Sequence, residues 1–134
     1  MAVAPIFKFR NVRKKLSTTS ATLLYGVVTG SDGIGNDYDP SQVSAVVLTI
    51  QIASSDVSAP VSTTLFVSDG IAGGVSVVQT LLVSQYPVPP QNAFDPLSGN
   101  LVLTDGLRVY AQTSTVDKIE IVMSLLEIAN AAAT

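Results

Sequence analysis

The chain is a succession of short apolar runs that are separated by Gly, Pro, Asp and Asn, and most of the runs alternate apolar with polar residues. A period of two places successive side chains on opposite faces of a β-strand, whereas an amphipathic helix repeats every 3.6 residues. The runs comprise residues 22–28, 43–53, 61–67, 75–84, 101–103, 107–112 and 119–128. They predict about seven or eight strands in an all-β, antiparallel β-sandwich or jelly-roll-like fold with an extended N-terminal arm.

Two of these runs are regular enough to indicate which side chains face the core. Alternate residues of a strand lie on the same face, so each run offers one strongly apolar face and one mixed face. In residues 43–53, the predicted core face consists of Val46, Leu48, Ile50 and Ile52. In residues 119–128, it consists of Ile119, Ile121, Met123 and Leu125.

The charged residues are distributed unevenly along the chain. Residues 1–16 carry five basic side chains and no acidic one, which gives this segment a charge of +5. The other residues carry two basic and ten acidic side chains and therefore have a charge of −8. Such a polarity indicates a segment with a role of its own. We therefore divide the chain into a basic N-terminal arm, residues 1–16, and a single β-sandwich domain, residues 17–134.

The arm contains the alternating sequence Phe7-Lys8-Phe9-Arg10. An extended strand places both Phe side chains on one face and both charges on the other, which suits addition to the edge of a partner's sheet. We therefore predict that the arm docks onto an acidic protein surface, such as that of a neighbouring identical subunit, and that the domain folds without it. The predicted partner-binding residues are Ile6, Phe7, Lys8, Phe9, Arg10, Arg13, Lys14 and Lys15.

Two other roles remain open for the arm. It can be a solvated tail that keeps an apolar protein in solution. It can also bind nucleic acid through its five charges, but the acidic remainder of the chain would be repelled by phosphates, and Phe7 and Phe9 are its only stacking residues. We therefore do not expect nucleic acid as a partner.

The composition argues against enzymatic chemistry. The chain contains no His, Cys or Trp, so it lacks the usual general base, the thiolate nucleophile and the soft metal ligands. Carboxylates remain available for catalysis. We predict that the protein is not an enzyme and that it has no catalytic residues, no cofactor and no metal. An apolar share of 47% with only 13% charged residues indicates instead that a partner covers part of the surface.

Three acidic residues, Asp32, Asp37 and Asp39, lie close together in a Gly-containing segment. Carboxylates at this spacing can bind Ca²⁺, but the segment lacks the distal Glu of an EF-hand loop. Short sequences of Asp, Asn and Gly are typical of turns. We interpret the segment as a turn and leave cation binding open. The proline-rich segment Tyr86–Pro90 is interpreted as an edge strand or as a crossing between strands.

Six segments follow one another in an order that has a known counterpart. They are Leu24-Tyr25 and residues 46–53, 63–69, 86–90, 101–111 and 119–128. This order resembles that of the small β-sandwich virion proteins of tailed bacteriophages, a group that includes capsid cement (decoration) proteins and neck or tail-fibre components. The resemblance covers residues 22–128 and brings no catalytic residues with it.

The resemblance implies a virion structural protein, and first of all a capsid cement protein that stabilises the phage head by bridging capsid subunits. The implied partners are the major capsid protein or other virion proteins, together with further copies of the chain in a dimer or trimer. The implied location is the capsid surface of the virion, after synthesis in the host cytoplasm. No segment is apolar enough to span a membrane, so no membrane partner is expected. A neck, tail or fibre component is the alternative, and a carbohydrate-binding module is a third reading that the missing Trp disfavours.

Overall fold

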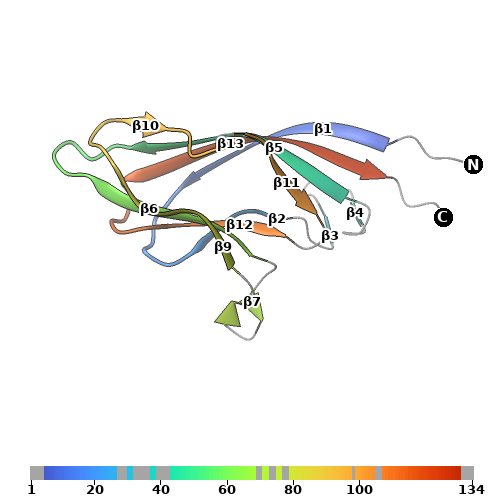
Figure 1. The fold of residues 1–134 in the computed structure, drawn as a ribbon, viewed down its shortest axis with the longest axis horizontal. Helices are drawn as coiled ribbons and strands as arrows, with labels where there is room; N and C mark the ends of the chain where they lie inside the picture. The colour runs from blue at the N-terminus through green and yellow to red at the C-terminus, as the bar shows by residue number, and fades with distance from the viewer. Residues whose placement is uncertain are drawn as a thin grey trace, which may run out of the picture.

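The structure is a computed structural model, and it describes residues 5–26, 30–31, 37–38, 43–68, 71–72, 75–76, 79–97, 99–104 and 107–130. Two antiparallel sheets lie one over the other as a sandwich, and the first and last described residues, Pro5 and Asn130, lie opposite each other at one end (Figure 1). We call them sheet A and sheet B. The described residues contain no helix, and therefore none that could cross a membrane. The predicted all-β sandwich is confirmed.

Sheet A has the strand order β1, β13, β5, and two short strands, β10 and β11, both pair with the far side of β5. The bounds of these strands are β1 Pro5–Lys15, β13 Ile119–Asn130, β5 Val43–Ser54, β10 Ala93–Phe94 and β11 Leu101–Thr104. The order of sheet B is β2, β12, β6, β9. Its strands are β2 Thr22–Gly26, β12 Arg108–Thr113, β6 Val61–Ser68 and β9 Gln79–Val88.

Apart from β6 and β9, which are neighbours in sheet B, successive long strands of the chain lie in opposite sheets, as in the double-sheet jelly roll. Two small two-stranded sheets are added to this framework. One pairs β3 (Gly30–Ser31) with β4 (Asp37–Tyr38), and the other pairs β7 (Ile71–Ala72) with β8 (Val75–Ser76). The jelly-roll-like prediction therefore holds at the level of strand order.

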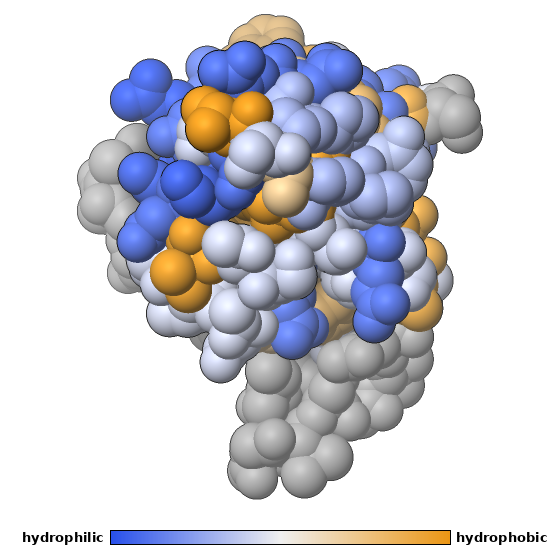
Figure 2. All heavy atoms as spheres, turned by 90° about the vertical axis from the view of Figure 1, so that its left-hand side faces the viewer, coloured by the Kyte–Doolittle hydropathy of each residue, from blue (hydrophilic) through white to orange (hydrophobic). Residues whose placement is uncertain are grey.

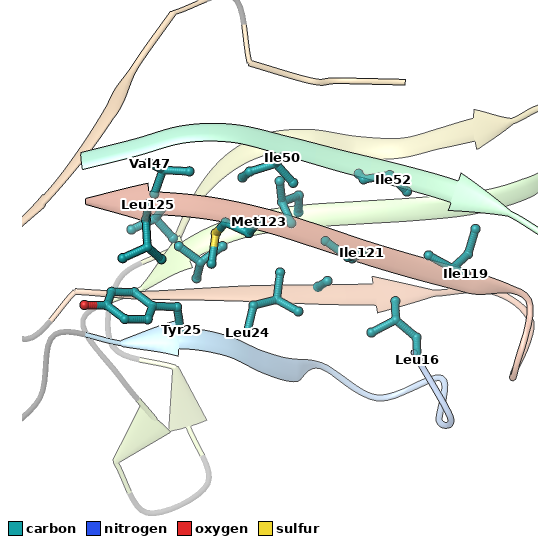
Figure 3. Packing of buried hydrophobic residues seen from close by; sticks show 14 of the residues in the cluster. Leu16, Leu24, Tyr25, Val47, Ile50, Ile52, Ile119, Ile121, Met123 and Leu125 are labelled. Atoms are coloured by element: carbon teal, nitrogen blue, oxygen red, sulfur yellow. The ribbon is translucent and has the colours of Figure 1, made fainter. Parts of the chain in front are cut away.

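The core lies between the two sheets, and β13 supplies much of it (Figure 3). Its predicted apolar face is confirmed, because Ile119, Ile121, Met123 and Leu125 are all at most 1% exposed. Leu24 and Tyr25 of β2 close the core from sheet B. Deleting a buried methyl or methylene group from such a core typically costs about 1 kcal/mol, so these positions dominate stability.

The predicted core face of β5 is only half right. Ile50 and Ile52 are fully buried, but Leu48 is 38% exposed and the buried residue before it is Val47. The pairing shows the cause, since Leu125 lies opposite Val47 while Ser124 lies opposite Thr49, which leaves Leu48 as an extra residue. This β-bulge reverses the inward and outward alternation, a change that a strict period of two cannot anticipate. Val46 and Leu48 therefore belong to the outer face of sheet A.

Sequence reasoning placed residues 1–16 outside the sandwich, whereas the structure places residues 5–15 inside it as the edge strand β1. β1 pairs with β13 without interruption, from Pro5 opposite Asn130 to Lys15 opposite Glu120. Leu16, which follows, is fully buried, and its N–H donates to the carbonyl of Ile119 at 2.9 Å. The strong charge of the segment suggested a separate arm, but charge at an edge strand can remain in solvent while the backbone completes the sheet.

Candidate protein-binding face of sheet A

β1 presents its side chains in the reverse of the usual arrangement for a strand of a sandwich. Phe7 and Phe9 are 61% and 76% exposed on the outer face of sheet A, while Lys8 and Arg10 are partly buried on the inner side. A one-residue shift in register would exchange the two faces and bury both rings. Something in the structure must therefore hold the register in which the rings face solvent.

The register is held by a buried carboxylate on β13. Glu127 is only 6% exposed, and its Oε1 accepts a hydrogen bond from Arg10 Nε at 2.8 Å. Its Oε2 accepts a hydrogen bond from the hydroxyl of Tyr25, which comes from sheet B. A shift of β1 by one residue would remove Arg10 and leave a buried charge without its counterion, which is strongly unfavourable. The Arg10–Glu127–Tyr25 cluster therefore ties β1 to both sheets and turns Phe7 and Phe9 outward.

The outward rings belong to an apolar row that crosses sheet A. The register places Phe9 beside Leu126, Leu126 beside Val46, and Val46 beside Val102. Val102 is 56% exposed, and Leu126 and Val46 are partly exposed. The next row begins with Phe7 beside Ile128. We call the row of Phe9, Leu126, Val46 and Val102 the apolar row. A contiguous apolar surface of this kind marks a site of protein interaction more often than a free surface.

The outer face changes from apolar to basic along β1. Arg13, Lys14 and Lys15 are exposed, and together with three residues of β13 they line a depression of about 370 Å³. The β13 residues are Glu120, Ile121 and Val122. Within the described part of the chain, none of the three cations forms an ion pair. This end of the face is suited to accept carboxylates from a partner.

The outer face of sheet B carries a row of its own, in which Tyr110 lies beside both Leu23 and Phe66, and Phe66 lies beside Leu81. The outer face of sheet B contains a depression of about 340 Å³ that is lined by neutral polar residues, namely Ser62, Thr64, Gln85, Gln112, Thr113 and Ser114. The end of the sandwich away from the termini is largely hydrophilic with scattered apolar side chains (Figure 2). Sheet A differs from sheet B in that its outer face carries Phe7 and Phe9, the two most exposed aromatic rings among the described residues.

Only part of the predicted binding segment can be placed residue by residue. Phe7, Phe9, Arg13 and Lys15 lie on the outer face, whereas Lys8, Arg10 and Lys14 lie on the inner side, where Lys14 is exposed. For Ile6, the structure describes the backbone in β1 but not the side chain. Sequence reasoning missed Glu127 and Tyr25. Glu127 was detectable in principle, since it continues the core face of β13 as a charged residue in an apolar period of two.

The carboxylates considered for a cation fall mostly outside the described residues. Asp32 and Asp39 are not described, and Asp37 is described only as backbone of β4. In the part of the chain that the structure covers, no group of three or more acidic side chains could hold a metal ion. The segment Tyr86–Pro90 begins as the end of β9, an edge strand of sheet B, where a proline costs no ladder hydrogen bond.

No family model matches the sequence, and no curated protein matches it. Solved structures do share the fold. A subunit of the Bacillus endospore appendages, described as a family of disulfide-linked pili, is 12% identical with a TM-score of 0.51, and the match covers 97% of this chain and 91% of that one. VP2 in the subviral particle of infectious bursal disease virus is 10% identical with a TM-score of 0.51.

The match to VP2 covers 96% of this chain but only 33% of the viral protein, so this chain spans about a third of its length. A second structure of that virus, its T13 particle, gives a TM-score of 0.50 at 10% identity. The structural similarity shows that these proteins share the jelly-roll fold. At such low sequence identities it shows nothing about function. This chain contains no Cys and so has no residue with which to form the disulfide links of the pili.

Proposed function

We propose that this chain is a structural protein of a tailed-phage virion, and that it acts as a capsid cement protein that bridges coat subunits on the head surface. The observation that carries this proposal is the apolar row, which begins at the outward-facing Phe9, together with the neighbouring outward-facing Phe7. A single-copy soluble protein gains nothing from exposing two aromatic rings on an edge strand, while a protein that is covered in an assembly gains a docking face.

The fold and the sequence pattern support this function. The jelly roll is shared with VP2 of a subviral particle and with a subunit of endospore pili, both of which are components of assemblies. The strand pattern resembles that of phage cement proteins. A cement role requires a rigid scaffold and repeated weak contacts, which symmetry multiplies into a strong attachment. It requires no catalytic residue and no cofactor, and further copies of the chain as a dimer or trimer would add to the avidity.

The copy number in purified particles tests the proposal. Quantitative mass spectrometry of virions should find this protein in a fixed ratio of order one to the major coat protein. A few copies per particle, as in a neck or tail ring, would instead assign the chain to that alternative class. Complete absence from particles would overturn a virion role.

A further inference from the structure

β1 is the outermost strand of sheet A, and none of the strands that the structure describes pairs with its other edge. The direction of its backbone groups follows from the pairing with β13. The N–H of Leu16 donates to Ile119 in the same register as the β1–β13 pairs, so the even-numbered residues of β1 face β13. The N–H and C=O groups of the odd-numbered residues point to the open edge, at Phe7, Phe9, Asn11, Arg13 and Lys15.

The charge beside this edge selects what can pair with it. Arg13, Lys14 and Lys15 follow one another along the edge and are exposed. A second copy of β1 contains no acidic residue, and antiparallel pairing about Asn11 would place Lys14 opposite Lys8, where like charges destabilise a strand pair. The outer strands β2, β9, β10 and β11 contain no acidic residue within their bounds. None of these described strands of the two main sheets therefore supplies a carboxylate to the cations of β1, which favours a partner segment from a different protein.

We propose that the open edge of β1 accepts an extended, acidic segment of a neighbouring protein as an additional antiparallel strand. Carboxylates of that segment lie against Arg13, Lys14 and Lys15, and its apolar side chains continue the apolar row beside Phe7 and Phe9. Backbone hydrogen bonds supply affinity in this mode, and the alternating side chains supply specificity. The identity of the neighbour as a coat subunit rests on the proposed function, whereas the added strand itself does not.

A matched pair of substitutions separates strand addition from side-chain docking. Asn11→Pro removes an N–H that points to the open edge, and Asn11→Ala keeps that N–H. Both variants lose the hydrogen bond from Ser124 Oγ to Asn11 Oδ1 at 2.8 Å. Neither removes a donor of the β1–β13 ladder, because Asn11 is odd-numbered. The two variants should therefore have similar melting temperatures, which circular dichroism checks.

The probe is a labelled peptide, Glu-Glu-Glu-Thr-Thr-Thr-Val-Thr-Val, that places Glu opposite Lys15, Lys14 and Arg13 when it pairs antiparallel with β1. Fluorescence anisotropy with the full-length chain should show binding that Asn11→Ala retains and that Asn11→Pro weakens by roughly ten-fold or more, since one hydrogen bond is lost and the proline ring blocks approach. A peptide with Lys in place of Glu should not bind. Equal binding to both variants, or no binding of the Glu peptide, would overturn strand addition.

Amide hydrogen exchange measured by NMR gives an independent result for the same complex. Saturating peptide should slow exchange at Phe9, Asn11 and Arg13, and should leave the already protected Arg10 and Val12 nearly unchanged. Exchange that slows at neither set would contradict the added strand. These assays use isolated protein and peptide, so they can show strand addition even if mass spectrometry finds no copies of the protein in virions. Strand addition and the virion role are therefore tested separately.

Discussion

Arg10 Nε and Glu127 Oε1 lie 2.8 Å apart although 117 positions separate the two residues in sequence. The pair joins the first strand of the fold to the last one, and the hydroxyl of Tyr25 adds a contact from the opposite sheet. Since Glu127 is buried, the strand cannot shift by one residue without losing its counterion. One ion pair thus decides that Phe7 and Phe9 face outward.

Glu127→Gln should lower the free energy of unfolding by about 1–3 kcal/mol, because the charge-assisted hydrogen bond from Arg10 is replaced by a weaker one. Urea denaturation followed by circular dichroism measures this loss. The control is Glu120→Gln on the same strand, where the side chain is exposed and a change within about 0.5 kcal/mol is expected. Equal losses of unfolding free energy in the two variants would show that the buried Arg10–Glu127 pair stabilises the fold no more than an exposed carboxylate does.

Removal of residues 1–15 should destabilise the isolated protein and cause it to aggregate. The deletion exposes the twelve-residue strand β13 as a new apolar edge and takes Arg10 away from Glu127. Differential scanning calorimetry and light scattering measure the two effects. A truncated chain that stays monomeric with an unchanged melting temperature would mean that the segment is a separate arm, as its charge alone suggested.

The double substitution Phe7→Ser and Phe9→Ser should abolish attachment to particles while leaving the melting temperature almost unchanged. Both rings are mostly exposed, so their loss costs the folded chain little. Leu125→Ala is the contrasting variant, since this fully buried side chain should cost about 2–5 kcal/mol of stability. Co-sedimentation with particles that lack the protein measures attachment. Normal attachment of the double variant would show that the two rings are not needed for docking.

Thr63 and Thr113 lie opposite each other on neighbouring strands and are both buried, but only one hydroxyl is satisfied. Thr113 Oγ1 donates to the carbonyl of Thr115 at 3.1 Å, whereas Thr63 Oγ1 has no partner among the described atoms. Thr63→Val should therefore stabilise the fold by about 1 kcal/mol, and Thr113→Val should destabilise it by a similar amount. The melting temperatures of the two variants should move in opposite directions, and a shift of both in one direction would contradict this assignment.

Ionised Asp56 should stabilise the folded chain, and this stabilisation should be lost at acidic pH. Backbone hydrogen bonds from Ser58 and then Ala59, both 2.9 Å long, lower the pKa of its carboxyl group below the usual range. A group whose pKa is lowered on folding stabilises the fold above its unfolded pKa, and this contribution is lost as the pH falls through the folded value. An NMR titration of the Asp56 carboxyl checks the direction, and a pKa at or above the usual range would contradict it.

Much of the fold could be predicted because the strands keep to a period of two. The core face of β13 was evident since Ile119, Ile121, Met123 and Leu125 alternate without interruption. The face of β5 could not be predicted in full, because the bulge at Leu48 is fixed by pairing with β13 rather than by local sequence. The two-residue strand β10 carries no such pattern and escaped prediction.

The candidate site was predictable only in part, for a related reason. The alternation of Phe7-Lys8-Phe9-Arg10 indicated a strand with one apolar face, and the structure has that strand. Its pairing partner and the direction of the rings depend on Glu127, at the other end of the sequence. The apolar row joins four strands through three sets of pairings, and no single segment contains that information.

Hydroxyl-radical footprinting of Phe7 and Phe9 tests most directly whether the outer face of sheet A is covered in an assembly. Both rings are exposed in the isolated chain and should be oxidised readily there. In intact particles their oxidation should fall at least several-fold, while Val57, exposed in a loop away from this face, should react as before. Equal oxidation of the two rings in free protein and in particles would contradict the account.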